Sequence, residues 1–150
     1  MEYYKEFEVR WADVDANKHM RHTAYNDYAA QVRVAFMMEN GLDNEAIEEY
    51  AIGPVLFREE TLFFRELVMC EKIKVDVRIR GLSKDGERWK MQHDIYKENG
   101  IPAATVNVEG AWIDSKKRKL KAPPAHLLEK FNELPKTDDF EWIIKGSKKG

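Results

Sequence analysis

The feature that most constrains the fold is a strict alternation of apolar and charged residues in the middle of the chain. From Ile73 to Ile79 every second residue is Ile or Val, and Lys, Asp or Arg stands between them. The same period returns from Trp89 to Ile95, after the turn signal Lys84-Asp85-Gly86. A sheet covered on both faces would show continuous apolar runs instead. The alternation therefore predicts antiparallel strands with one covered face.

Three further segments extend this predicted sheet. Tyr3 to Trp11 alternates with Phe7, Val9 and Trp11 on its apolar face, which predicts the first strand. A mixed run from Val55 to Phe64 is also strand-like, although its two faces cannot be separated by period. The last long strand follows the turn signal Asn99-Gly100 and places its apolar side chains at Ala104, Val106, Val108 and Trp112.

A single long helix is expected from about Thr23 to Glu39. Its apolar positions recur every three or four residues, at Tyr25, Tyr28, Ala29, Val32, Ala35 and Phe36. Gly41 follows as a stop signal, and 43–50 reads as a short second helix or turn. The order of one strand, a long helix and about four strands predicts an α+β fold, in which a long central helix packs on an antiparallel sheet of about five strands.

Length and composition favour one soluble domain over residues 1–150. Lys and Arg (25) nearly balance Asp and Glu (27), so the net charge of -2 predicts no nucleic-acid partner and no attraction to an anionic membrane. Cys70 is the single cysteine, which excludes an intrachain disulfide and fits a reducing compartment. The N-terminal segment is charged throughout and no apolar run is long enough to span a bilayer, so we expect a cytoplasmic protein.

The polar residues between Trp11 and Arg33 form the candidate active site. The chain has neither a GxGxxG loop nor a GxSxG elbow, so nucleotide-loop and serine-elbow chemistry lack their usual sequence support. Asp15 lies one loop before the predicted long helix, whose first amides are free to stabilise an oxyanion. A carboxylate is a weak base at neutral pH, so an activated acyl group such as a thioester would suit it. A helix-capping Asp15 is the plainer alternative.

The same stretch resembles the hotdog-fold acyl-CoA thioesterases, specifically the 4-hydroxybenzoyl-CoA thioesterase-like group, over roughly 7–123. The residues that carry the resemblance are Arg10-Trp11-Ala12-Asp13-Val14-Asp15-Ala16, His19-Met20, His22, Tyr25, Tyr28 and Arg33. The order of helix and strands agrees with the hotdog fold as well.

The resemblance implies hydrolysis of an acyl-CoA, or of an acyl-carrier-protein thioester, to a carboxylic acid and a thiol. It places the catalytic carboxylate, as nucleophile or general base, at Asp15. The amide that polarises the carbonyl falls at His22, whose ring assists in some branches, and Tyr25 matches the tyrosine of the motif. It also implies a homodimer or dimer of dimers that binds acyl-CoA between subunits. We expect no cofactor, because coenzyme A is part of the substrate.

Two further residues are substrate-binding candidates, and two positions depart from the family pattern. His19 lies in the same loop as Asp15, and Glu59 is a possible second carboxylate near a subunit contact. Lys18 stands where the family usually has glycine, and Asn17 is expected to supply the left-handed backbone conformation in its place. Cys70-Glu71 replaces the Gly-Asp of many relatives.

Several alternatives remain open from the sequence. Asp13, Asp15, His19 and His22 together could hold a metal ion, although we predict none. The protein could also be a noncatalytic acyl-CoA-binding protein or a hotdog dehydratase. Asp13 is interpreted as loop-ordering and His93 as a hydrogen-bonded core residue. The basic run 116–121 is expected to be a solvated turn, with contact to a coenzyme A phosphate as the minority interpretation.

Overall fold

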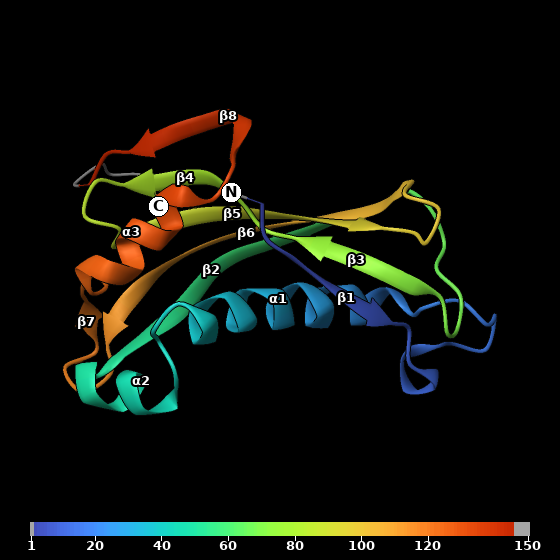
Figure 1. Ribbon diagram of the computed structural model, residues 1–150, viewed down its shortest axis with the longest axis horizontal. Helices are drawn as coiled ribbons and strands as arrows, with labels where there is room; N and C mark the ends of the chain where they lie inside the picture. Colours follow the sequence, from blue (N-terminus) through green and yellow to red (C-terminus); the bar gives the residue numbers. More distant parts are fainter. Residues whose placement is uncertain (1, 146–150) are drawn as a thin grey trace.

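A long helix lies along one face of a curved sheet in the computed structural model, which describes residues 2–145 (Figure 1). The strands are β1 (Tyr4–Glu8), β2 (Ile52–Phe63), β3 (Lys72–Asp76), β4 (Arg78–Ser83), β5 (Arg88–Tyr96), β6 (Pro102–Asp114), β7 (Lys119–Leu120) and β8 (Lys136–Ile143). The helices are α1 (Tyr25–Glu39), α2 (Asn44–Tyr50) and α3 (Ala125–Glu133), with 3-10 turns at Trp11–Asp13 and His22–Ala24. None of the described helices has the length and apolar character needed to cross a bilayer.

The sheet contains five long strand lines, as predicted. β3 and β4 are two parts of one line interrupted at Val77, and both pair antiparallel with β5. β5 pairs with β6 and β6 with β2, while β1 pairs with β3 on the other side, all antiparallel. The order across the sheet is therefore β2, β6, β5, β3/β4 and β1.

The core lies between α1 and the sheet. Along β5 the buried residues are those at every second position from Trp89 to Ile95, and on α1 they are Tyr25, Tyr28, Ala29, Val32 and Phe36. β2 and β6 approach closely at Gly110, where an added Cβ would lie 2.1 Å from the carbonyl oxygen of Val55 and 2.7 Å from the ring of Trp89. Any side chain at this position would clash, so glycine permits the close approach of β2 and Trp89 to β6.

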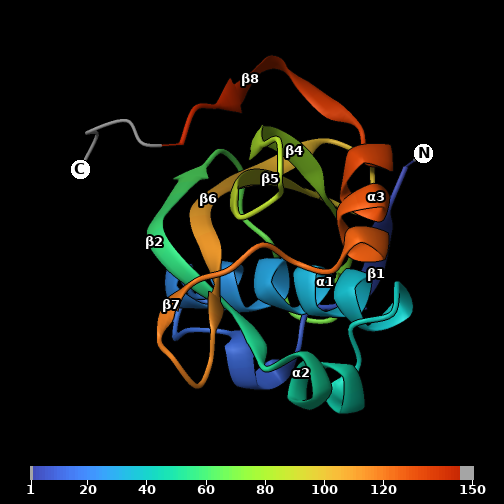
Figure 2. The same ribbon diagram turned by 90° about the vertical axis from the view of Figure 1, so that its left-hand side faces the viewer.

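The structure differs from the sequence-based expectation at both ends of the chain. β1 ends at Glu8, and Trp11, expected on its apolar face, is 80% exposed in a 3-10 turn. Toward the other end the structure adds the helix α3, which buries Leu127 and Phe131. It also adds the strand β8, which pairs parallel with β4 and buries only Thr137. The turned view shows α1 and β8 on opposite sides of the molecule, with α3 along one flank (Figure 2).

Candidate active site

The loop that carries Asp15 is a small hairpin. Val14 and Met20 form an antiparallel bridge, and the amide of Asp15 donates to the carbonyl of His19 over 2.9 Å. At the tip the amide of Lys18 donates to the carbonyl of Asp15 over 2.9 Å. Lys18 itself has a φ of 68°, so the expectation that Asn17 supplies the left-handed conformation is wrong. A non-glycine residue therefore occupies the position where left-handed backbone favours glycine.

Cys70, the second position at which many relatives have glycine, has the same left-handed backbone as Lys18. Cys70 has a φ of 66° and is exposed, and its amide donates to the carbonyl of Val9 over 2.8 Å. The backbone at Cys70 is thus left-handed without glycine. Both departures from the family pattern coincide with positive φ.

The carboxylate of Asp15 is exposed, and the described residues donate hydrogen bonds to only one of its two oxygens. Its Oδ1 accepts from the amide of Asn17 at 2.9 Å and from that of His19 at 3.3 Å, which is the geometry of an Asx turn. Within residues 2–145 no group donates to Oδ2. One oxygen thus fixes the orientation of the carboxylate while the other is available to a ligand or a water molecule.

The start of the long helix supplies free amides. Arg21 is extended, and the 3-10 turn at His22–Ala24 continues into α1 at Tyr25. The amide of Ala24 donates to the carbonyl of Arg21 over 3.0 Å, whereas the amides of His22 and Thr23 find no acceptor among the described residues. Amides at a helix start are the expected donors for a negative oxygen.

Asp13 anchors this loop to the helix. Its carboxylate is buried, and it accepts from Arg10 at 2.9 and 3.1 Å, from Arg21 at 3.2 Å and from the hydroxyl of Tyr28 at 2.7 Å. The hydrogen bonds from Arg10 are the main reason that the pKa of Asp13 lies below its ordinary value. The structure thus gives Asp13 an ordering role and turns it toward its arginine partners.

An open pocket of about 410 Å³ brings Asp15, His19, His22 and Tyr25 together. Its remaining walls are Asn17, Met20, Phe63, Phe64, Arg65 and Glu66. The ring of Tyr25 meets that of Phe63 edge-on, with centroids 5.0 Å apart. The hydroxyl of Tyr25 has no protein partner in the described part of the chain, and burial raises its pKa, so it remains a hydrogen-bond donor at neutral pH.

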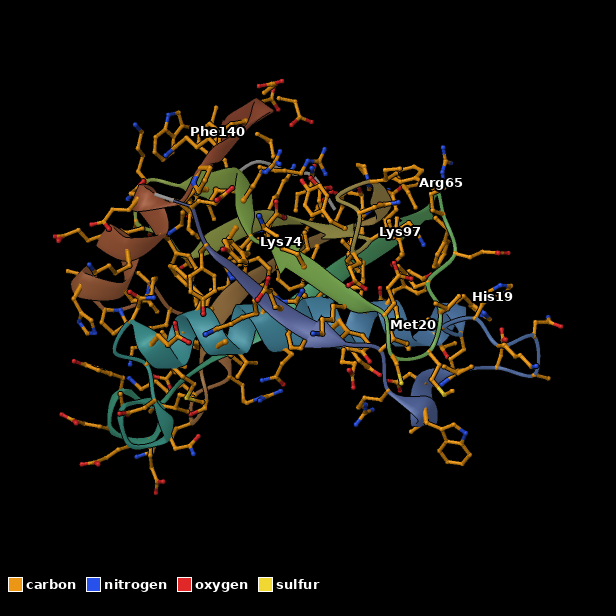
Figure 3. All side chains as sticks on the ribbon, turned by 45° about the vertical axis from the view of Figure 1, so that its right-hand side comes forward. His19, Met20, Arg65, Lys74, Lys97 and Phe140 are labelled. Carbon is orange, nitrogen blue, oxygen red and sulfur yellow. The ribbon has the colours of Figure 1, made fainter. Side chains whose placement is uncertain are left out.

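His19 connects this pocket to the segment after β2. Its Nε2 lies 3.1 Å from Oε2 of Glu66, and its backbone bridges to Val68. Figure 3 shows His19 and Arg65 at the same end of the molecule. The sequence did not single out Phe63 to Glu66, because β2 is exposed along most of its length and has no clear period. The run Phe63-Phe64-Arg65-Glu66 at the end of β2 was the sequence signal that could have identified this wall of the pocket.

Glu59 lies outside this pocket. It is paired with the buried Val108 of β6, which places its side chain on the face that α1 covers. The nearby charge of Glu59 acts to raise the pKa of Arg33 on α1. The structure therefore associates Glu59 with Arg33 and not with Asp15.

The structure does not gather the candidate metal ligands of the loop into a binding site within residues 2–145. Within the part of the chain that the structure describes, no group of three or more His, Cys, Asp or Glu side chains is arranged to hold an ion. Asp13, one of the four candidate ligands, is engaged by arginines.

Comparison with known proteins gives a family and a fold. The family model described as the thioesterase-like superfamily matches residues 9–131. The Staphylococcus aureus protein SAV2348, solved in complex with CoA, is 23% identical and superposes with a TM-score of 0.82 over 90% of this chain and 87% of that one. A 1,4-dihydroxy-2-naphthoyl-CoA thioesterase from Synechocystis, Slr0204, is 15% identical, with a TM-score of 0.78 over 89% of this chain and 98% of that one.

A DHNA-CoA thioesterase from S. aureus is 21% identical, with a TM-score of 0.72 over 81% of this chain and 80% of that one. The comparison with curated proteins gives no match. The structural likenesses confirm the predicted hotdog fold. Since the family model covers most of the sequence, this chain belongs to the thioesterase-like superfamily.

Proposed function

We propose that the protein hydrolyses an acyl-CoA, or an acyl-carrier-protein thioester, to a carboxylic acid and a free thiol. The observation that carries this proposal is the pocket that Asp15 and His22 line together. It combines a carboxylate that has one unpaired oxygen with two unpaired amides at a helix start. Membership of the thioesterase-like superfamily supports the same reaction class.

The proposed chemistry uses the two sides of this pocket. The amide of His22 donates to the thioester carbonyl oxygen and stabilises the negative charge that develops there. Asp15 either attacks the carbonyl carbon or takes a proton from the water that attacks it. If Asp15 acts as the base, the C–S bond breaks, the water oxygen stays in the carboxylic acid, and the proton held by Asp15 passes to the thiolate. If Asp15 attacks, the C–S bond breaks to leave an anhydride on Asp15, water hydrolyses it to the carboxylic acid and protonated Asp15, and that proton passes to the thiolate. Tyr25 supplies a hydroxyl donor at the helix start, and His19 lines the approach from the loop.

The coenzyme A part of the substrate is expected on the rim beside Arg65. This exposed residue lines the pocket, and a guanidinium suits phosphate binding. A related structure was solved in complex with CoA. The basic run 116–121 leads into β7, which lies at the end of the molecule opposite the loop after β1 (Figure 1). Within one protomer, that run is remote from Asp15.

We further propose a homodimer, or a dimer of dimers, formed through β2. Among the described residues β2 pairs only with β6, so its outer edge is open. Leu56, Phe57, Leu62 and Phe63 are exposed along it, and an open apolar edge is a site for strand pairing. A partner there would also cover Phe63. The exposed, unpaired Cys70 fits the cytoplasmic location that we propose.

One panel of substrates distinguishes this function from its two alternatives. Saturated acyl-CoAs and 3-hydroxyacyl-CoAs are incubated with the protein, while thiol release and enoyl-CoA absorbance are followed in parallel and binding is measured by calorimetry. Hydrolysis predicts thiol release from at least one saturated acyl-CoA. Binding without thiol release would identify a noncatalytic binding protein, and enoyl formation without thiol release would identify a dehydratase.

A further inference from the structure

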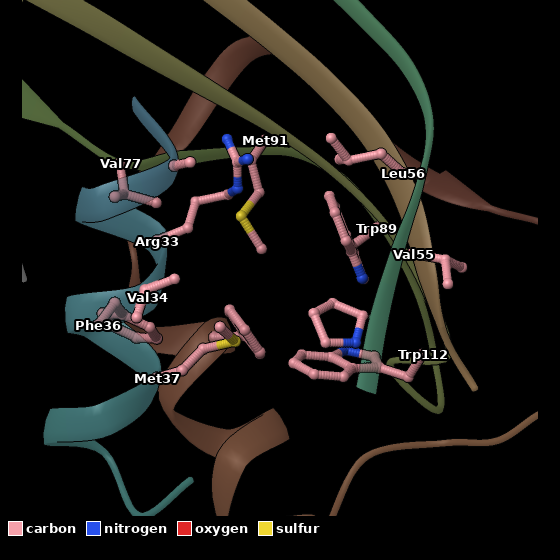
Figure 4. Close-up of a pocket in the computed structure, with 13 residues that line it drawn as sticks. Arg33, Val34, Phe36, Met37, Val55, Leu56, Val77, Trp89, Met91 and Trp112 are labelled. Atoms are coloured by element: carbon pink, nitrogen blue, oxygen red, sulfur yellow. The ribbon is translucent and has the colours of Figure 1, made fainter. Parts of the chain in front are cut away.

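A second cavity lies between the C-terminal half of α1 and the sheet. Its volume is about 130 Å³, and it shares no lining residue with the pocket around Asp15. Its apolar walls are Ala30, Val34, Phe36, Met37, Pro54, Val55, Leu56, Val77, Trp89, Met91, Trp112 and Phe131. Arg33 is the single charged residue among the described lining residues. Figure 4 shows Arg33 extending from α1 along one side of the cavity toward Met91.

The guanidinium of Arg33 is held by a neutral partner. Its Nη1 lies 3.1 Å from Nε2 of His93, and Nδ1 of His93 lies 2.8 Å from the carbonyl oxygen of Asp76. Because a carbonyl only accepts, Nδ1 carries the proton and Nε2 accepts from Arg33. Burial lowers the pKa of His93 to about 3, so this ring remains uncharged. His93 positions the guanidinium without balancing its charge.

No carboxylate compensates Arg33 at contact distance. Within residues 2–145, no Asp or Glu oxygen lies within 4 Å of its guanidinium, and its remaining nitrogens have no protein acceptor. Glu59, across on β2, is the acid whose charge acts on Arg33, but it is exposed to solvent. Burial lowers the pKa of Arg33, but a guanidinium remains protonated in proteins. Arg33 is half-buried, and its remaining nitrogens can donate to an anionic ligand that enters the cavity.

We propose that this cavity binds a small free carboxylic acid, with its apolar part between α1 and the sheet and its carboxylate on Arg33. A dry apolar cavity of about 150 Å³ holds a benzene molecule in another protein, which sets the size of the apolar part. The fork of the guanidinium donates to both oxygens of a carboxylate. Tyr25 and Arg33 are eight residues apart, about 12 Å along the helix. A short acyl group at Asp15 does not reach across this distance.

The test compares acids with their neutral amides, which match them in shape. Benzoate and benzamide, and pentanoate and pentanamide, are titrated into the protein by calorimetry. We expect each acid to bind at least about 10-fold more tightly than its amide, because charge-assisted hydrogen bonds are the stronger ones. In NMR spectra the indole N–H signals of Trp89 and Trp112 should shift, and those of the exposed Trp11 and Trp142 should not.

Variants of two residues separate charge from packing. Arg33→Gln should remove the preference for the acid, and Arg33→Lys should retain part of it because the charge remains. Glu59→Gln should tighten acid binding several-fold without changing amide binding, because it removes a competing negative charge. These measurements need no turnover, so they are independent of thioester hydrolysis.

Three results would overturn the proposal. Equal affinities for acids and amides would leave Arg33 without an anion-binding role. Acid binding that shifts neither Trp89 nor Trp112 would place the site elsewhere. Absence of acid binding at millimolar concentration would also overturn it. If Arg33→Gln then slowed thiol release from suberyl-CoA, whose acyl chain ends in a carboxylate, but not from octanoyl-CoA, Arg33 would belong to the thioester substrate site instead.

Discussion

The hydroxyl of Tyr28 donates a 2.7 Å hydrogen bond to Oδ2 of the buried Asp13 carboxylate, and so ties the first turns of α1 to the loop that precedes them. Asp15, two residues farther along, is exposed and has one free oxygen. The two acids of one short motif therefore have different environments. Asp13 orders the loop, and Asp15 is the one that a ligand can reach.

Asp13→Asn should destabilise the protein. The change removes the negative charge that receives hydrogen bonds from Arg10, Arg21 and Tyr28. Because both arginines are partly exposed, we expect a loss of about 2 kcal/mol in unfolding free energy at pH 7. Tyr28→Phe removes one hydrogen bond only and should cost about 1 kcal/mol. Urea unfolding of the variants measures both values, and a fully stable Asp13→Asn would refute the anchoring role.

The same contact has a pH dependence of known sign. The pKa of Asp13 is lower in the folded state than in the unfolded state. Its contribution is therefore present above the unfolded pKa of about 3.9 and is lost as pH falls through the folded value. The stability gap between wild type and Asp13→Asn should narrow on acidification below pH 4.

Lys18→Gly should stabilise the loop. Lys18 has a φ of 68°, which a side chain disfavours and glycine adopts freely. We expect a gain of about 0.5–1 kcal/mol, and a similar gain for Cys70→Gly at φ 66°. Asn17→Gly is the matched control, since Asn17 has no positive φ and glycine there should give no gain. Equal effects of Lys18→Gly and Asn17→Gly in thermal unfolding would contradict this explanation.

Asp76 should make the protein less stable as pH rises. Burial raises its pKa to about 6, although the hydrogen bond from the amide of Asp94 and the charge of Arg78, 3.4 Å away, both act to lower it. A carboxyl whose pKa is raised on folding stabilises most below its unfolded pKa, and this stabilisation is lost as pH rises through about 6. The shift corresponds to at most about 3 kcal/mol.

Asp76→Asn provides the comparison, because its amide oxygen can still accept from the amide of Asp94. The unfolding free energy of Asp76→Asn, relative to that of wild type, should be higher at pH 7.5 than at pH 4. His93 titrates in both proteins, so its effect cancels in the difference. Parallel pH curves would mean that Asp76 does not titrate near 6.

The sequence predicted best where one face of an element is buried. β5 alternates because its inner side chains pack against the core, and α1 has a clear stripe for the same reason. β8 escaped prediction because it buries only Thr137 and lies at the edge of the sheet. Phe63 was missed because β2 is exposed on both faces, so no period marks its inward residues.

The candidate site was predictable for the loop and helix start but not for the second cavity. Asp15, His22 and Tyr25 lie within eleven residues of one another, and their pocket follows from local structure. Arg33 and His93 are sixty residues apart and meet only when α1 packs on β5. His93 matched the expectation of a hydrogen-bonded core residue, but its partner could not be named from the pattern.

The most direct test of the central claim is thiol release by Asp15→Asn compared with Asp27→Asn. Asp27 is also exposed and lies in the first turn of α1, but it does not line the pocket. With the best acyl-CoA of the panel, Asp15→Asn should lose about 10²–10⁴-fold in kcat/KM while its unfolding curve matches wild type. Asp27→Asn should keep the wild-type rate. A folded Asp15→Asn that releases thiol as fast as Asp27→Asn would contradict the role of Asp15.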